Sequence, residues 1–389
     1  MTEGKRQQQV VPWFELFYDL IVVSVVVAAG KILVGAPTWH TAGFTAACLL
    51  LLLTLWLLTT LSYGLYRRNS QPRRLLLLCQ MAALLIAALS AGAKGLPSEW
   101  GYLAIGVAFA CAAGVYALHR RWSPADGIPN GLIVVTCLVS AAYFMAAAVA
   151  VVLLPAGSLD TSIVVLLIGL ALGAVPVAGT YLGRALPRLD LHHLEERVGL
   201  IVIIVLGESF LALIIRLASQ STIPSIPAFV LAIAVPYAVW SLYFTGVIVR
   251  EPPASANPLR LWFAAHALLV ISIAASATAL ADMTLIPFST LDDTESSWSP
   301  LSTLGIACGL LLICVLSGRH GDTPSRTNRF AISAMGVTTA VIVALQVINL
   351  LPDGPPRGPL FLGASLALVL DAIVLAVFAP RPTDPVPAG

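Results

Sequence analysis

Residues 192–218 read HHLEERVGLIVIIVLGESFLALIIRLA, and this stretch decides the class of fold. It opens with His, Glu and Arg and then stays apolar for a length that crosses a bilayer, roughly 20 residues in an α-helix. Glu208 interrupts the apolar run near its middle. A carboxyl group at that depth costs free energy, so we take Glu208 as a candidate functional residue.

The composition of the whole chain agrees with this stretch. Hydrophobic residues make up 59% of the 389 residues and charged residues only 10%, with a mean hydropathy of +0.93. Soluble domains are nearer 45–50% apolar and about 25% charged. The composition therefore indicates a multi-pass protein, which we expect in the cell membrane. The six cysteines fall in apolar runs without metal-ligand spacing, so no disulfide framework and no bound metal is expected.

The sequence predicts an all-α protein with twelve transmembrane helices, because Pro, Gly and charged residues separate twelve apolar runs. The predicted spans are 12–30, 40–63, 74–93, 101–118, 130–154, 161–182, 194–217, 227–249, 259–281, 301–317, 329–351 and 359–378. The first run contains Glu15 and Asp19, which a cleaved signal peptide would not tolerate, so we expect a retained helix.

The basic residues predict the orientation. With twelve spans, both termini lie on the same side, and that side holds most of the 21 Lys and Arg residues. The opposite side holds only Lys31, Lys94, Arg216 and Arg357. The positive-inside rule then places both termini in the cytoplasm.

The two halves of the chain, 1–190 and 191–389, resemble each other at four places in the same order. The matching pairs are Glu15 with Glu195, Trp56 with Trp240, Gln80 with His266, and the segment LLPAG at 153–157 with LLPDG at 350–354. We therefore expect one membrane domain built from two parallel six-helix repeats. Transporters with parallel repeats bind their substrates between the repeats.

Two carboxylates in the first span are candidate acids. Glu15 and Asp19 are four residues apart and share a helix face, and Asp19 lies roughly 10 Å inside the membrane surface at 1.5 Å per residue. Two close carboxylates at low dielectric differ in proton affinity, so one of them can act as an acid. The alternative for Glu15 is a favourable charge at a helix start.

The seventh span supplies three further candidate catalytic residues, and the ninth span supplies His266. His193, Arg197 and Glu208 fall on one stripe of the helix, but Arg197 and Glu208 are about 16 Å apart along it and cannot pair. We expect the first span to face Glu208, so that Glu15, Asp19, Glu208 and His266 form one cluster. The structural alternatives are an interhelical hydrogen bond for Glu208 and His266 and a solvated helix start for His193. His193 and Glu196 have a spacing that occurs in metal sites, but the sequence has no second pair of this kind, so no bound metal is expected.

Aromatic residues gather toward the cytoplasmic ends of the predicted spans. The candidate substrate-binding residues are Trp13, Phe17, Tyr18, Trp240, Tyr243, Phe244 and Trp262. An interfacial aromatic belt explains many of them. The alternative is a cavity whose ring faces hold a cation or an unsaturated lipid.

Residues 13–20, WFELFYDL, resemble the N-terminal motif of the bacterial low-temperature-requirement protein A (LtrA) family. Residues 196–201, ERVGLI, with 206–209, LGES, resemble its second motif. The resemblance implies a many-helix membrane fold over nearly the whole chain, but the family name records a growth phenotype and supplies no activity. Residues 63–68, YGLYRR, lack the Asn and acidic residues often found there, which would suit a specialised member.

Three functions remain open on this sequence. The first is an intramembrane enzyme in which a buried carboxylic acid protonates a lipid-soluble substrate such as an isoprenoid, as a terpene cyclase does. The second is a proton-coupled transporter, and the third is a non-catalytic membrane protein. No phosphate-loop, dinucleotide, serine-hydrolase or zinc-protease motif occurs, so no cofactor is expected. The expected partners are membrane lipids and a lipophilic small molecule rather than nucleic acid, and the oligomeric state stays open.

Overall fold

The computed structural model describes residues 13–35, 38–66, 70–94, 98–122, 130–154, 159–218, 225–244, 252–285, 299–317, 326–349 and 357–378. Within these ranges the chain forms twelve long α-helices, of 18 to 28 residues each, and no strand. The prediction of an all-helical protein is confirmed.

The helices of the N-terminal half are α1 (Trp13–Gly35), α2 (Trp39–Leu65), α3 (Gln71–Lys94), α4 (Glu99–Trp122), α5 (Asn130–Leu153) and α6 (Leu159–Pro176). A short α7 (Leu182–Ala185) follows. The C-terminal half contains α8 (Leu191–Ala218), α9 (Ile226–Phe244), α10 (Ala256–Met283), α11 (Ser299–Ser317), α12 (Arg326–Asn349) and α13 (Arg357–Phe378).

Eleven of these helices are long and apolar enough to cross a membrane. The other long helix, α11, contains the shorter apolar segment Ser302–Leu316. Each predicted span therefore corresponds to an observed helix, and the protein is multi-pass. The span predicted at 227–249 corresponds to α9, of which the structure describes the part up to Phe244; the rest lies outside the described residues.

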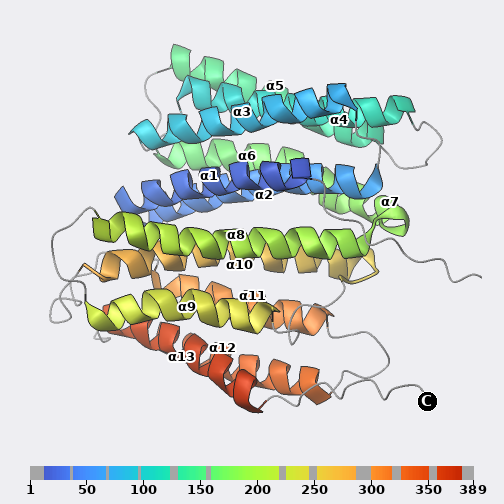
Figure 1. The fold of residues 1–389 in the computed structure, drawn as a ribbon. Coiled ribbons are helices and arrows are strands. Elements are labelled where there is room, and N and C mark those ends of the chain that lie inside the picture. The colour runs from blue at the N-terminus through green and yellow to red at the C-terminus, as the bar shows by residue number, and fades with distance from the viewer. Residues whose placement is uncertain are drawn as a thin grey trace, which may run out of the picture.

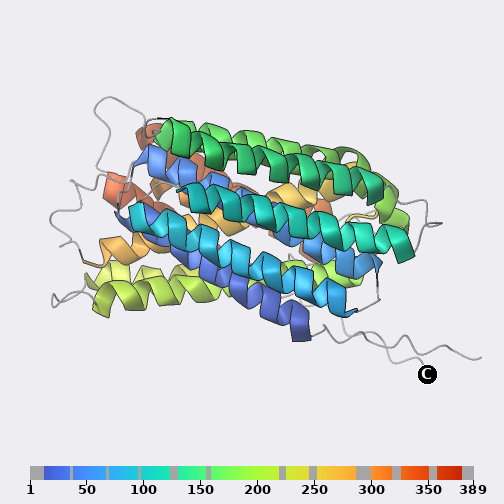
Figure 2. The ribbon, with the colours of Figure 1, turned by 90° about the horizontal axis from the view of Figure 1, so that it is seen from above.

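The helices lie side by side, with the N-terminal half above the C-terminal half in Figure 1 and a common helix direction in Figures 1 and 2. α1 and α2 meet α8 and α10 where the halves join. Helices at corresponding places in the two halves pack together in the same pairs. α1 packs on α3 as α8 packs on α10, α2 on α6 as α9 on α13, and α3 on α4 as α10 on α11.

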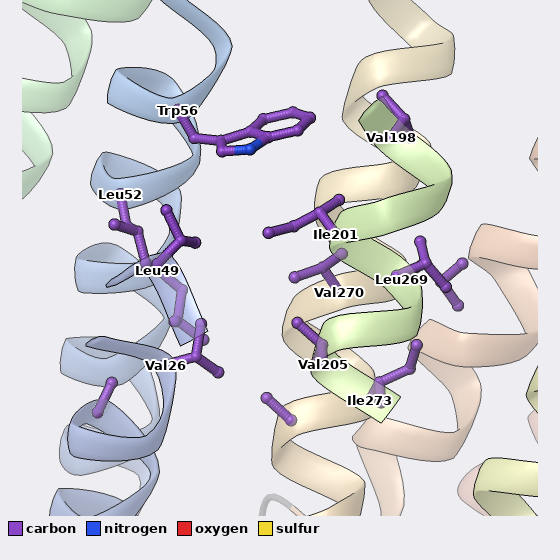
Figure 3. Packing of buried hydrophobic residues seen from close by; sticks show 14 of the residues in the cluster. Val26, Leu49, Leu52, Trp56, Val198, Ile201, Val205, Leu269, Val270 and Ile273 are labelled. Atoms are coloured by element: carbon purple, nitrogen blue, oxygen red, sulfur yellow. The ribbon is translucent and has the colours of Figure 1, made fainter. Parts of the chain in front are cut away.

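Apolar side chains fill the junction between the halves. Figure 3 shows Val26, Leu52 and Trp56 on one side facing Ile201 and Val205 on the other. All five are buried. Because lipid tails are as apolar as these side chains, close packing rather than the hydrophobic effect holds such helices together.

The end of α6 differs from a regular helix. Pro176 is followed by a π-helical turn, Val177–Tyr181, before α7 begins. A π-turn disrupts the usual i to i−4 hydrogen bonds, and the carbonyl of Gly179 accepts a hydrogen bond of 2.5 Å from Arg260 of α10. This hydrogen bond links the N-terminal half to the C-terminal half.

The contact between α4 and α5 provides a stability test. A Cβ atom at Gly106 would lie 3.0 Å from the carbonyl oxygen of Ala141 and 3.1 Å from Met145. Because a backbone carbonyl cannot rotate away, Gly106→Val should destabilise the protein by about 1–3 kcal/mol. Gly336 has open space, so Gly336→Ala is the matched control. Thermal unfolding in detergent should show a lower Tm for the first variant only, and an equal Tm for both would contradict this packing.

Candidate functional site

The start of α8 is set by a helix cap. The side chain of Asp190 accepts a hydrogen bond of 3.1 Å from the backbone N–H of His193, which satisfies one of the free N–H groups at the helix start. His193 and Arg197 are four residues apart and so share a face of α8. That face is turned toward α1, which packs against α8.

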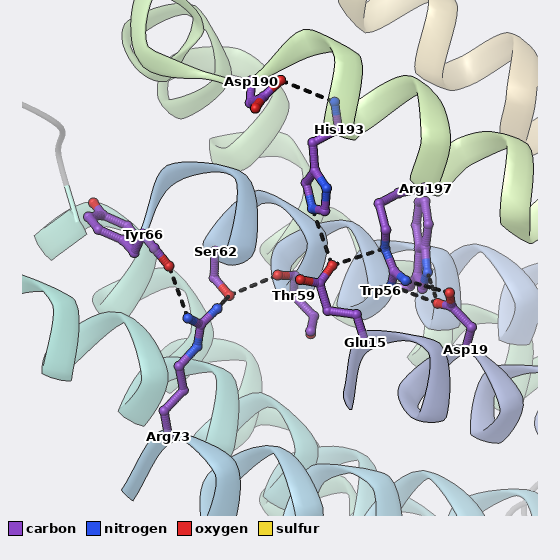
Figure 4. Close-up of polar contacts among 10 residues, drawn as sticks. All are labelled: Glu15, Asp19, Trp56, Thr59, Ser62, Tyr66, Arg73, Asp190, His193 and Arg197. Atoms are coloured by element: carbon purple, nitrogen blue, oxygen red, sulfur yellow. Dashed lines mark hydrogen bonds and ion pairs between the residues drawn. The ribbon is translucent and has the colours of Figure 1, made fainter. Parts of the chain in front are cut away.

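Arg197 forms the central interaction of the site. Its side chain is 0% exposed and binds Asp19 of α1 through two hydrogen bonds, 2.5 Å from Nη1 to Oδ2 and 2.7 Å from Nη2 to Oδ1 (Figure 4). The indole N–H of Trp56 donates a third hydrogen bond to Asp19, 2.9 Å long. An acceptor of three donors is an ionised carboxylate, so Asp19 acts as the anion that neutralises Arg197.

Glu15 lies one turn before Asp19 and connects two basic groups. Its Oε2 atom is 3.2 Å from Nε2 of His193 and 3.4 Å from Nε of Arg197. Glu15 and His193 are both buried. Glu15 therefore lies within ion-pair distance of two basic side chains, His193 and Arg197.

We call Glu15, Asp19, Trp56, His193 and Arg197 the interface cluster. Sequence reasoning selected both carboxylates, His193 and Arg197, and the structure brings these four together. It placed Trp56 only as a repeat match and missed its hydrogen bond to Asp19. The sequence signal that could have revealed this hydrogen bond is the position of Trp56 near the end of the second span, at a depth similar to that of Asp19.

A second polar group adjoins the interface cluster, and sequence reasoning missed it. Arg73 of α3 is buried, donates to the carbonyl of Tyr66 and to the hydroxyl of Ser62, and covers the ring of Tyr63 at 3.8 Å. Figure 4 shows this group beside Glu15. The Arg73–Arg74 pair predicts a cytoplasmic helix start, but sequence does not reveal which arginine turns inward.

Glu208 does not belong to the interface cluster, contrary to the predicted grouping. Its Oε1 faces Gly30 of α1, at whose position a Cβ atom would be 3.5 Å away, beside Thr278 of α10. Eleven residues separate Asp19 from Gly30 and also Arg197 from Glu208, roughly 16 Å along each helix. α1 therefore faces Glu208, as predicted, but three turns beyond its acidic residues. Oε2 of Glu208 has no hydrogen-bond partner among the described residues.

His266 also lies apart from the carboxylates. Its Nε2 is 2.9 Å from the Tyr243 hydroxyl and its Nδ1 is 2.8 Å from the carbonyl of Trp262. The three side chains are buried and packed ring against ring. They form an aromatic contact between α9 and α10 rather than a base beside Asp19, so the predicted four-residue cluster is corrected in this respect as well.

The other predicted substrate-binding residues are dispersed. Phe17 is 47% exposed and Trp240 is 41% exposed, and both lie on the outer surface of the bundle. Phe244 packs against Tyr243, and Tyr18 is buried. The side chain of Trp13 lies outside the described residues. A single aromatic wall around the carboxylates is therefore not observed in the described part of the chain.

An apolar cavity lies on the other side of α1. Residues of α1, α2, α3, α4 and α6 line it, including Val25, Ala29, Leu55, Leu84 and Ala87. Its free volume is about 60 Å³, smaller than the roughly 300 Å³ of the smallest usual ligand pockets.

Polar side chains flank the cavity-lining segments of α2 and α3. One helical turn beyond Leu55 lies Thr59, and one turn before Leu84 lies Gln80. Thr59 is hydrogen-bonded to Gln80 at 3.4 Å. Neither Thr59 nor Gln80 lines the cavity itself.

This arrangement pairs Arg197 with the carboxylate of Asp19 and places a second buried carboxyl group, that of Glu15, near Arg197 and His193. The described residues contain no group of three or more His, Cys, Asp or Glu side chains placed to hold a metal ion. The architecture and the buried charges define a polytopic helical membrane protein with an intramembrane ion cluster.

The whole sequence assigns this protein to a family. It matches the family described as bacterial low temperature requirement A protein (LtrA) over residues 10–382, and the chain belongs to that family. No curated protein and no solved structure matches the chain. The family assignment agrees with the resemblance of the two motifs that supply Glu15, Asp19 and Arg197.

A double-mutant cycle tests the pairing of Asp19 with Arg197. Removing one partner of a buried ion pair leaves an uncompensated charge, so Asp19→Asn or Arg197→Gln alone should destabilise the protein by about 3–5 kcal/mol. The double variant should lose clearly less than the sum of the two, because no charge remains unpaired. The measurement is unfolding monitored in detergent micelles.

The control for this cycle is Glu196→Gln. Glu196 lies 3.4 Å from the exposed His192, and a surface pair of this kind contributes about 0–1 kcal/mol. Strictly additive losses in the double variant, or a loss for Glu196→Gln as large as that for Asp19→Asn, would contradict the assigned pairing.

Proposed function

We propose that the protein is an intramembrane acid–base enzyme acting on a lipid-soluble substrate of the isoprenoid class, as membrane-bound terpene cyclases do. The observation that carries the proposal is the position of Glu15. Glu15 is buried on α1, the helix that also lines the apolar cavity, and its Oε2 atom lies 3.2 Å from His193 and 3.4 Å from Arg197. A buried acid in contact with a histidine, on a helix that lines an apolar cavity, supplies groups that proton transfer to a hydrocarbon requires.

The carboxylates have different roles in this proposal. Asp19 is neutralised by Arg197 and Trp56, so it positions Arg197 and does not donate a proton. Glu15 lies farther from Arg197, with 3.4 Å between its Oε2 atom and Nε of the arginine, and in this proposal it takes its proton from His193. Glu15 is therefore the catalytic acid, and Asp19 and Arg197 are positioning residues.

The reaction is an isomerisation without a change of redox state. The O–H bond of Glu15 breaks as its proton adds to one carbon of an alkene, which leaves a carbocation at the other. A second alkene of the same substrate attacks this cation and closes a ring. Loss of a proton to the carboxylate of Glu15 restores both the alkene and the acid. Tyr18, three residues after Glu15 on the same helix, is the aromatic ring that would stabilise the cation.

A deuterium experiment tests this chemistry. The full chain in lipid nanodiscs is incubated in heavy water with farnesylated and geranylgeranylated candidate substrates, and the products are analysed by mass spectrometry. We expect a cyclic isomer that carries one solvent deuterium. Glu15→Gln should reduce its rate at least about 100-fold, the lower end of a general acid's contribution. Ala87→Phe, which fills the cavity, should also abolish it, whereas Glu196→Gln should retain full activity.

A second candidate function is proton-coupled transport, and Glu208 favours it. This acid lies where two parallel helices of the two halves meet, without a hydrogen bond on Oε2. Transporters place such acids near the midplane between repeats. Proton-dependent solute uptake in vesicles that Glu208→Gln abolishes, with no product from any prenylated substrate, would replace the enzyme proposal. If the protein yields no product and no uptake, the non-catalytic alternative is favoured.

The proposal includes a duplicated architecture in the cell membrane. Residues 1–190 and 191–389 form the two six-helix repeats, supported by the four sequence matches and by the helix pairs that recur in both halves. The excess of Lys and Arg supports cytoplasmic termini.

Reporter fusions in bacterial cells test this orientation. Alkaline phosphatase is active only outside the cytoplasm. It should be inactive when fused after Gly389 and active when fused after residue 158, in the joint between α5 and α6. A fluorescent-protein fusion after Gly389 should label the cell envelope. An active phosphatase at the C-terminus would reverse the proposed orientation.

A further inference from the structure

One buried acid lies far from the interface cluster. Asp371 is near the middle of α13, which packs against α9, α11 and α12. Its side chain is 4% exposed and forms a hydrogen bond with Thr338 of α12. Its Oδ2 atom has no hydrogen-bond partner among the described residues. The proposed chemistry does not use this acid.

Asp371 lines a groove between α12 and α13. The groove has a volume of about 470 Å³, within the range of about 300–1,000 Å³ that small-molecule sites occupy. Its walls are mainly apolar and include Phe330, Val337, Val341, Leu370 and Val374. Val337 is 65% exposed, so the groove opens on the outer surface of the bundle, which faces lipid in a membrane.

The chemistry of the groove selects its occupant. An acyl chain fills an apolar groove but leaves Oδ2 of Asp371 without a partner, and an unpartnered polar atom in hydrocarbon is unfavourable. A hydroxyl group both donates and accepts hydrogen bonds, so it pairs with a carboxyl group in either protonation state. The remaining walls require an apolar body.

We propose that the groove between α12 and α13 binds a membrane-dissolved alcohol, a lipophile with a hydroxyl group that pairs with Oδ2 of Asp371. This site is separate from the cavity beside α1 and does not rest on the proposed enzymatic activity. Its entrance is lateral, from the lipid, because the exposed Val337 and Leu370 form its rim.

Photolabelling tests the site. The full chain in nanodiscs is irradiated with a diazirine analogue of farnesol or with the matching methyl ether, which lacks the hydroxyl donor. The cross-linked peptides are identified by mass spectrometry. The alcohol should label α12 and α13 at least about 10-fold more than the ether, as expected when one buried hydrogen bond is lost.

Three variants separate the hydrogen bond from the shape of the groove. Asp371→Leu should abolish the preference for the alcohol over the ether. Asp371→Asn should retain labelling by the alcohol but reduce its preference over the ether, because the amide N–H can donate to the ether oxygen. Val337→Trp should block labelling by both compounds while leaving Asp371 unchanged, and it keeps the test valid if Asp371→Leu fails to fold.

Three results would overturn the proposal. The first is equal labelling of α12 and α13 by the alcohol and the ether. The second is labelling that persists in Val337→Trp. The third is a cross-link between two copies of the chain through α12 or α13 that excludes both compounds, because the occupant would then be a second copy.

Discussion

The ion pair between Arg197 and Asp19 is the interaction on which the rest of the structure depends. A fully buried guanidinium is tolerated only when a carboxylate neutralises it with good geometry, and here the partner is on a helix of the other half. The pair therefore fixes how α1 and α8 lie along each other. The equal spacing from Asp19 to Gly30 and from Arg197 to Glu208 follows from that register.

The two faces of α1 meet different surroundings, because successive side chains of a helix point in different directions around its axis. Glu15, Asp19 and Gly30 turn toward α8 and its charged or polar side chains. Val25 and Ala29 line the apolar cavity beside α2, α3 and α4. Glu15 and Tyr18 lie near the start of α1. A single helix thus carries both a buried acid and apolar side chains that line a cavity, which is the physical basis of the proposed chemistry.

The sequence predicts the helices well because apolar length and punctuation are local signals. It also predicts that Glu15 and Asp19 share a helix face, but not that Arg197 is the partner of Asp19. It fails where contacts depend on helix rotation and depth. Glu208 and His266 were expected near Asp19, but Glu208 lies three turns away along α8 and His266 turns toward Tyr243. Arg73 was invisible as a buried residue, because its neighbours Ser62 and Tyr66 come from another helix.

The central claim is that Arg197 neutralises Asp19 as an anion, so that Glu15 and not Asp19 is the acid of the proposed reaction. Infrared spectroscopy of the protein in nanodiscs measures this directly, since a protonated carboxyl group has its own C=O stretching band. The account predicts a band that Glu15→Gln removes and Asp19→Asn leaves in place. A band that disappears in Asp19→Asn, or the absence of any band that depends on Glu15, would contradict it.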